Sequence, residues 1–341
     1  MKSMSREQRL ALSATKPVPP YAIDPALTFY CPQENVTAFD EPRIRAFMAH
    51  LRSDYQPPAP VIAAEKAVLL LLPCTKTKPY LLSKEHLHIN RYLLDGLGFV
   101  PIGTPDYPPA IAEALPEGFP LSALHNGLLQ HGSLVVHRMV VSEPMGIVPF
   151  EYIYHWRGEL SLVSRYDDPG LFEHRGASVC TWRKDNTATP LGNGKYRWGV
   201  NERAAYVEAH NRYSQHMAAV LKRLKPYYHT ILGYVAPKMT HRSFLTSAAE
   251  KAAGGLPRAR KTGQGSGQLI GVNDLVPGLV HVVPDAAEQA EALAALGKRL
   301  PYLSPAGRSG YFSTGGGIAT ALVLPEILAI LKKHLQTIER R

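Results

Sequence analysis

The sequence predicts an α/β fold, with a mixed or largely parallel sheet flanked by helices and extra C-terminal α/β elements. Two observations lead to this prediction. Residues 67–72 form an uninterrupted apolar run, which is typical of a strand buried on both faces of a parallel sheet. Segments with helical periodicity then alternate with further short apolar runs, as in proteins built from β-loop-α units.

The individual elements follow from periodicity and from their end signals. Ile44, Phe47, Met48 and Leu51 would share one face of an early helix, and Ser83 and Gly96 have the residue types that begin and end another. The expected elements are helices at 41–53, 84–95, 204–224 and 286–298, strands at 67–72, 134–141, 229–235 and 279–283, and a last helix from about 318 that is interrupted at Pro325.

The loop after the first strand carries most of the reactive side chains. It reads Pro-Cys-Thr-Lys-Thr-Lys-Pro-Tyr-Leu-Leu-Ser-Lys-Glu-His over residues 73–86. Because α/β proteins bind ligands beyond the carboxyl ends of their strands, this loop is the predicted site of chemistry. Each residue also has an ordinary structural role open to it, such as helix capping by Ser83 or simple burial of Cys74.

A second block supports an interpretation of the loop by resemblance. Residues 140–151 read Val-Val-Ser-Glu-Pro-Met-Gly-Ile-Val-Pro-Phe-Glu, and Tyr166-Asp167 follows. Together with Pro-Cys-x3-Lys-Pro-Tyr-x2-Ser-x2-His, filled at every fixed position, this pattern resembles the catalytic domain of the archaeosine synthase family over roughly residues 28–240. The chain departs from the family at Glu143, where a serine is usual, and in lacking a recognisable RNA-binding PUA pattern.

The resemblance implies a division of the chain and a set of site residues. Residues 1–60 would be an N-terminal lead-in with a helix, 61–240 the catalytic domain, and 241–341 a basic loop and a C-terminal helical extension packed on it. The implied catalytic residues are Cys74, Lys78, Tyr80, Ser83 and His86. The implied substrate-binding residues are Ser142, Pro144, Gly146, Glu151 and Asp167.

The implied reaction is attack on the nitrile of 7-cyano-7-deazaguanine held in a nucleic acid. A thiolate at Cys74 would add to the nitrile carbon, with His86 or Tyr80 moving protons, or Lys78 would be the crucial group and Cys74 only structural. Water as second nucleophile gives a carboxamide in DNA, which is the expected reaction. The alternatives are addition of lysine to the same base in tRNA, and DNA binding without catalysis.

Composition agrees with a nucleic-acid partner. The formal net charge is +10 and the pI about 9.4, which favours binding to a polyanion. The segment 250–267 is glycine-rich and cationic, and it is expected to be a mobile loop in which Arg258, Arg260 and Lys261 contact phosphates. Association with other proteins of a modification system is a further expectation.

The cysteines and the hydrophobic pattern set the remaining expectations. Three widely separated cysteines, Cys31, Cys74 and Cys180, argue against a disulfide framework and favour a reducing cytoplasm. The chain has no Cys-x2-Cys pair, so we expect neither a metal site nor a cofactor. No apolar run has the length of a membrane span, and no signal peptide is recognisable.

Overall fold

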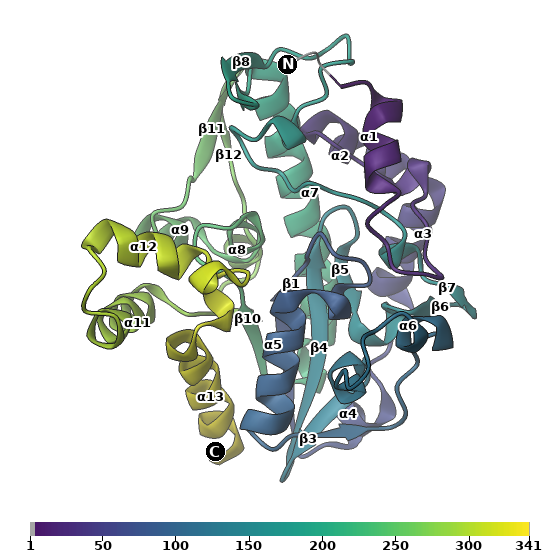
Figure 1. The fold of residues 1–341 in the computed structure, drawn as a ribbon, viewed down its shortest axis with the longest axis vertical. Helices are drawn as coiled ribbons and strands as arrows, with labels where there is room; N and C mark the ends of the chain where they lie inside the picture. Colours follow the sequence, from purple (N-terminus) through teal and green to yellow (C-terminus); the bar gives the residue numbers. More distant parts are fainter. Residues whose placement is uncertain (1–3, 341) are drawn as a thin grey trace.

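The computed structural model describes residues 4–340 and confirms the α/β fold around one seven-stranded sheet (Figure 1). Its strands are β1 (Lys66–Pro73), β2 (Val100–Ile102), β3 (Leu128–His131), β4 (Leu134–Ser142), β5 (Gly146–Pro149), β10 (Thr230–Tyr234) and β13 (His281–Val283). The strand order is β13-β10-β1-β4-β3-β2, with β5 paired to β4. Strands β13, β10, β1 and β4 are parallel, whereas β2, β3 and β5 pair in antiparallel fashion.

Helices cover both faces of the sheet. They are α1 (Arg6–Ser13), α2 (Pro32–Thr37), α3 (Pro42–Ser53), α4 (Ala59–Ala63), α5 (Lys84–Arg91), α6 (Pro109–Glu113), α7 (Val200–Leu224), α8 (Thr240–Leu245), α9 (Ala248–Ala253), α10 (Val272–Leu275), α11 (Ala286–Arg299), α12 (Pro305–Ser313) and α13 (Pro325–Arg340). In Figure 1, helix α5 runs alongside β4 in front of the sheet, and α7 descends from the β8 end of the molecule toward the far side of the sheet. The strand order agrees with this arrangement, because the chain leaves β1 in one direction and later returns past it in the other.

The strand order creates a switch point beside β1. The chain passes from β1 toward β4 and later returns to place β10 on the other side of β1. Loops that leave neighbouring parallel strands in opposite directions open a crevice at the carboxyl edge of the sheet. The loops after β1, β4 and β10 therefore meet at one edge.

Three smaller hairpins lie outside the main sheet. They are β6 (His155–Trp156) with β7 (Glu159–Leu160), β8 (Thr189–Gly192) with β9 (Lys195–Arg197), and β11 (Ala259–Thr262) with β12 (Gly265–Gln268). The last pair corrects the prediction of a mobile loop at 250–267. Ser247 caps α9, and Gly265, at a φ of 114°, allows the chain to reverse between β11 and β12.

The prediction that Pro325 interrupts the last helix was wrong. Helix α13 begins at Pro325, and short 3-10 turns at Gly315–Gly317 and Ala321–Val323 precede it. Proline suits the first helical position because its fixed φ is helical and the missing N–H would have no partner there.

The core surrounds the predicted first strand. Residues 67–72 are all buried, and β1 pairs in parallel with β10 on one side and β4 on the other. The helices expected near 41–53, 204–224 and 286–298 are α3, α7 and α11. No helix within residues 4–340 is both long and apolar enough to cross a membrane.

Gly146 determines how closely β5 can follow β4. Its φ is +74°, and an added Cβ would lie 2.5 Å from Cδ2 of His216. Replacing Gly146 with alanine is expected to lower the free energy of unfolding by about 2–4 kcal/mol, because backbone strain and overpacking act together. Urea denaturation measures the loss.

Gly103 provides the matched control for this substitution. Its φ is +82°, but no heavy atom lies within 4 Å of the added Cβ. Gly103→Ala should therefore cost only the backbone strain, about 1–2 kcal/mol. Equal losses in the two variants would contradict close packing between Gly146 and His216.

Candidate active site

Three polar side chains meet where the parallel strands end. Cys74 follows β1, Glu143 follows β4, and His241 lies in α8, which follows β10. The sulfur of Cys74 is 3.1 Å from Nε2 of His241 and 3.8 Å from Oε2 of Glu143. The same Glu143 oxygen is 3.3 Å from Nε2 of His241. These three residues are called the Cys74 cluster below.

The charges within the Cys74 cluster support one another. Burial alone would lower the pKa of His241, but the Cys74 sulfur and the Glu143 carboxylate outweigh it and hold that pKa well above its usual value. Burial would raise the pKa of Glu143, but the charge and hydrogen bond of His241 lower it. The cluster thus contains an imidazolium and a carboxylate, both in contact with the Cys74 sulfur.

The Cys74 cluster opens into a cavity of about 520 Å³. Beyond the cluster, its walls include Lys76, Ser83, Asp168, Phe172, Arg175, Met239 and Thr320. Arg175 packs over the ring of Phe172, with its guanidinium carbon 4.0 Å from the ring centre. The cavity therefore combines a nucleophile, acidic groups, an aromatic face and cationic side chains.

Asp168 is a second acidic group beside the cluster. Burial, reinforced by the negative charge of Glu143, raises the pKa of Asp168 well above its usual value. Its Oδ1 accepts a hydrogen bond from the backbone N–H of Gly170 at 2.6 Å, while the buried Oδ2 has no partner among the described residues. A neutral carboxylic acid at this position can donate a proton into the cavity.

The other loop residues of the motif lie beneath the cavity. Lys78 is buried, donates a hydrogen bond to the Thr75 carbonyl, and places its Nζ 4.6 Å from the ring centre of Tyr80 and 4.5 Å from that of Tyr166. Burial lowers the pKa of Lys78. The Tyr80 hydroxyl contacts both Tyr166 and Ser142, the latter at 3.1 Å. This layer holds the shape of the loop.

His86 and Ser83 also have structural partners. Nε2 of His86 is 2.9 Å from the Pro73 carbonyl, and burial lowers the pKa of His86 to about 4. The ring is therefore neutral near pH 7, and its N–H donates to Pro73. Ser83 lines the cavity and caps α5. Its hydroxyl oxygen accepts a hydrogen bond from the backbone N–H of His86 at 3.2 Å. Of the five predicted catalytic residues, Cys74 and Ser83 line the cavity.

The predicted substrate-binding residues divide into three groups. Ser142 belongs to the tyrosine layer, and its hydroxyl is 2.6 Å from that of Tyr166. Pro144 lies in the turn between β4 and β5 that positions Glu143, and Gly146 begins β5. Glu151 instead pairs with His137 at 3.1 Å, and Asp167 accepts a hydrogen bond from Ser13 at 2.6 Å. Neither Glu151 nor Asp167 lines the cavity of the Cys74 cluster.

The predicted phosphate-binding residues lie at the β11–β12 hairpin. Arg258 and Lys261 are exposed. Nε of Arg260 is 3.5 Å from a carboxylate oxygen of Glu173, and its guanidinium lies over Tyr206. Glu173 follows Phe172, a cavity residue, so the hairpin reaches the same side of the molecule as the cavity.

The Cys74 cluster also has the donor types that zinc prefers. One ligand atom from each of Cys74, Glu143 and His241 lies within 4.8 Å of the others. Sulfur, carboxylate and imidazole donors are those of three-ligand zinc sites. A second such group, Cys31, Glu34 and Cys180, lies away from this cavity. The prediction of a metal-free protein therefore needs a direct test.

Sequence reasoning missed His241 and Asp168, and it noticed Glu143 only as a departure from a pattern. His241 could have been found by the rule that identified Cys74, because it also follows a predicted parallel strand. Asp168 adjoins the predicted Asp167, but only the fold shows that the two neighbours face different cavities.

No protein-family model matches this chain, and no match was found among curated proteins or solved structures.

Proposed function

We propose that this chain hydrates the nitrile of 7-cyano-7-deazaguanine in DNA to the carboxamide, using Cys74 as a covalent nucleophile. The observation that carries the proposal is the contact of the Cys74 sulfur with His241, whose pKa is raised, at the wall of a cavity. The motif of residues 73–86 supplies the identity of the substrate, because it resembles that of a family acting on this nitrile.

The first step forms a thioimidate. The Cys74 thiolate adds to the nitrile carbon, a C–S bond forms, and the electron pair of one C–N π bond moves to nitrogen. That nitrogen takes a proton from Asp168, which burial keeps neutral. Covalent catalysis divides a difficult addition of water into two easier steps.

The second step releases the carboxamide. A water molecule adds to the thioimidate carbon and loses a proton, while the nitrogen accepts one, so the carbon becomes tetrahedral. The C–S bond then breaks, the electron pair returns to sulfur, and the remaining hydroxyl proton passes to the Asp168 carboxylate as the carbonyl forms, which restores the neutral acid. Glu143 and His241 are placed to pass these protons, and the charge of His241 stabilises the departing thiolate. The net change is the addition of one water.

A nucleic acid rather than a free nucleoside is proposed as the carrier because several cations lie near the cavity. Arg258 and Lys261 are exposed at the β11–β12 hairpin, and Arg175 lines the cavity itself. Cationic side chains around a cavity suit a strand whose target base has turned out of the stack. Lys78 would act through the shape of the loop, because it is buried beneath the cavity.

The test is a product analysis with the purified full chain. Cyano-containing DNA and tRNA are incubated with the protein, with and without lysine, and with and without a metal chelator, then digested to nucleosides for mass spectrometry. We expect the modified DNA nucleoside to gain the mass of one water in every incubation that contains DNA, with or without lysine and with or without the chelator. A gain of one lysine in tRNA would indicate the amine-transfer alternative, loss of activity with the chelator would indicate a metal, and no mass change would contradict catalysis.

A further inference from the structure

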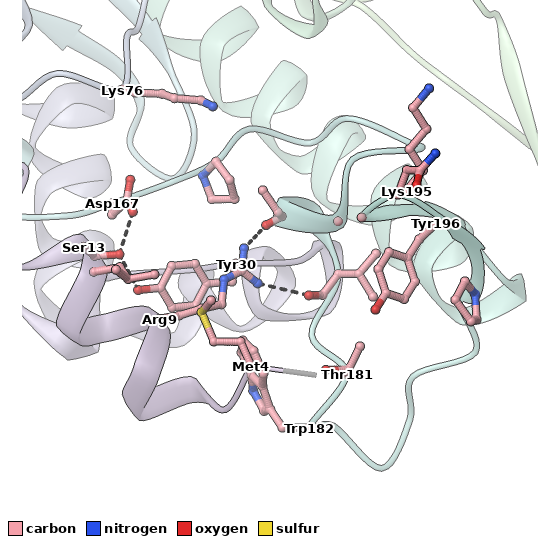
Figure 2. A pocket seen from close by; sticks show the side chains of 18 of the residues that line it. Met4, Arg9, Ser13, Tyr30, Lys76, Asp167, Thr181, Trp182, Lys195 and Tyr196 are labelled. Atoms are coloured by element: carbon pink, nitrogen blue, oxygen red, sulfur yellow. Dashed lines mark hydrogen bonds between the residues drawn. The ribbon is translucent and has the colours of Figure 1, made fainter. Parts of the chain in front are cut away.

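A second cavity adjoins that of the Cys74 cluster. It has a volume of about 610 Å³ and is bounded by α1, Tyr30, residues 176–182 and the β8–β9 hairpin (Figure 2). This cavity is called the flanking pocket. Lys76 and Pro169 line both cavities, and the consecutive residues Asp167 and Asp168 line one each. The two cavities are therefore neighbours that share part of one wall.

The flanking pocket carries cations that have no acidic partner. Within residues 4–340, no carboxylate lies within ion-pair distance of Lys76 or Lys195 in this pocket, or of Arg175 in the adjoining cavity, whereas Lys16 pairs with Asp167. Partial burial, together with the charges of Arg175 and Lys16, lowers the pKa of Lys76. Figure 2 shows Lys76 and Lys195 on opposite sides of the pocket. An anion bound between the two cavities would neutralise this concentration of positive charge.

Another wall of the flanking pocket consists of planar side chains. The guanidinium of Arg9 lies 4.3 Å from the ring centre of Tyr30 and 5.4 Å from that of Trp182. Hydrogen bonds from Arg9 to the carbonyls of Ala177 and Val179 hold its plane in place, the second at 3.0 Å. Tyr196 lines the same pocket. Aromatic rings and arginine planes are the surfaces on which unpaired bases stack.

Asp167 provides a hydrogen-bond acceptor in this pocket. The residue is buried, and its Oδ2 accepts from Ser13. Its Oδ1 is buried and has no partner among the described residues. A ligand bearing an N–H group, such as a nucleobase, would satisfy that oxygen, since a buried acceptor without a donor is costly.

We propose that the flanking pocket binds the nucleotide next to the modified base, with its base stacked against Arg9, Trp182 and Tyr196. The phosphate between the two nucleotides would contact Lys76 and Arg175, and the phosphate on the other side of the flanking nucleotide would contact Lys195. This inference rests on the proposed function for the identity of the strand. The inference further implies that the protein binds a single-stranded segment at least two nucleotides long, with one nucleotide in each cavity.

The test measures binding of a fluorescein-labelled single-stranded DNA 12-mer without any modified base. The double variant Trp182→Ala, Lys195→Ala should bind about 10- to 100-fold more weakly than the natural chain, through loss of stacking and of one phosphate contact. Trp182→Phe should retain most of the affinity, because a ring remains. The control is Lys298→Ala, Tyr302→Ala, which removes the same kinds of side chain from an exposed position on α11 and the residues after it.

The outcomes separate this inference from the proposed reaction. Unchanged affinity in the Trp182, Lys195 variant, with the fold intact by circular dichroism, would overturn the inference even if nitrile conversion were found. Weaker binding in that variant would support it even if no conversion occurred, because the probe carries no nitrile. Equal affinity of the natural chain for a free mononucleotide and for the 12-mer would also overturn it, since the pocket would then be a site for a small ligand.

Discussion

Replacement of Cys74 with alanine is expected to lower the rate of nitrile conversion by about 10⁴-fold or more. The alanine side chain cannot form the thioimidate, and no other cysteine is near, because Cys31 and Cys180 are buried elsewhere. Folding should be retained, since Cys74 is only partly buried. Single-turnover assays on cyano-containing DNA, with nucleosides quantified by mass spectrometry, measure the loss.

Cys180→Ala is the matched control for this variant. It removes a thiol that lies with Cys31 outside the cavity, so its conversion rate should stay close to that of the natural chain. If Cys74→Ala instead kept a near-normal rate, the covalent mechanism would fail, and the central role would pass to Lys78, the other candidate in the loop.

His241→Gln is expected to produce the second large effect, a loss of turnover of roughly 10³-fold. Glutamine keeps hydrogen-bonding capacity but cannot carry the positive charge that favours the thiolate and its departure. A readout independent of catalysis is alkylation of Cys74 by iodoacetamide. At pH 6 the variant should react roughly 30-fold more slowly, because it lacks the charged ring that contacts the sulfur.

The pH range of this effect follows from the two shifted groups. The pKa of His241 is raised in the folded protein. The stabilisation that its charged form gives to the folded cluster is therefore complete below about pH 6.5, and it is lost only as the pH rises through the higher folded pKa. The pKa of Glu143 is lowered in the folded protein. The stabilisation that its carboxylate gives to the folded cluster is therefore present above about pH 4.3, and it is lost as the pH falls through the lower folded pKa. Both charges are therefore present together between about pH 4.5 and 6.5, and the alkylation measurement at pH 6 lies within this range.

His88→Gln serves as the control for His241→Gln. His88 is exposed on α5 and contacts the Lys84 carbonyl, away from the Cys74 sulfur. Its alkylation profile should match that of the natural chain. If the His241→Gln profile matched as well, the contact between His241 and Cys74 would have no chemical role.

The sheet and the loop after β1 could be predicted because their signals are local. The apolar run at 67–72 and the two prolines that flank the loop determine β1 and the turn after it. Helix α7 could be found from the periodic apolar face that includes Tyr213 and Met217. These features depend on residues within one or two dozen positions of one another.

The composition of the Cys74 cluster could not be predicted in the same way. His241 meets Cys74 across a sequence separation of 167 residues, and only the strand order places β10 beside β1. Burial of Lys78 was equally hidden, because a lysine after a strand is usually solvated and nothing local indicates the rings of Tyr80 and Tyr166 beneath it. The segment at 250–267 was mistaken for a mobile loop because its glycines suggest flexibility, whereas here they allow a tight hairpin turn.

The tyrosine layer beneath the cavity has a consequence for how such sequences can diverge. Tyr80, Ser142 and Tyr166 come from three separate segments and share hydrogen bonds in a buried space. A change at one of them leaves a hydroxyl without a partner or a void without water, and a compensating change at another restores the fit. Residues at these three positions should therefore vary together among descendants of this chain. Substitutions in the cavity walls above them should occur independently and change which ligand the cavity accepts.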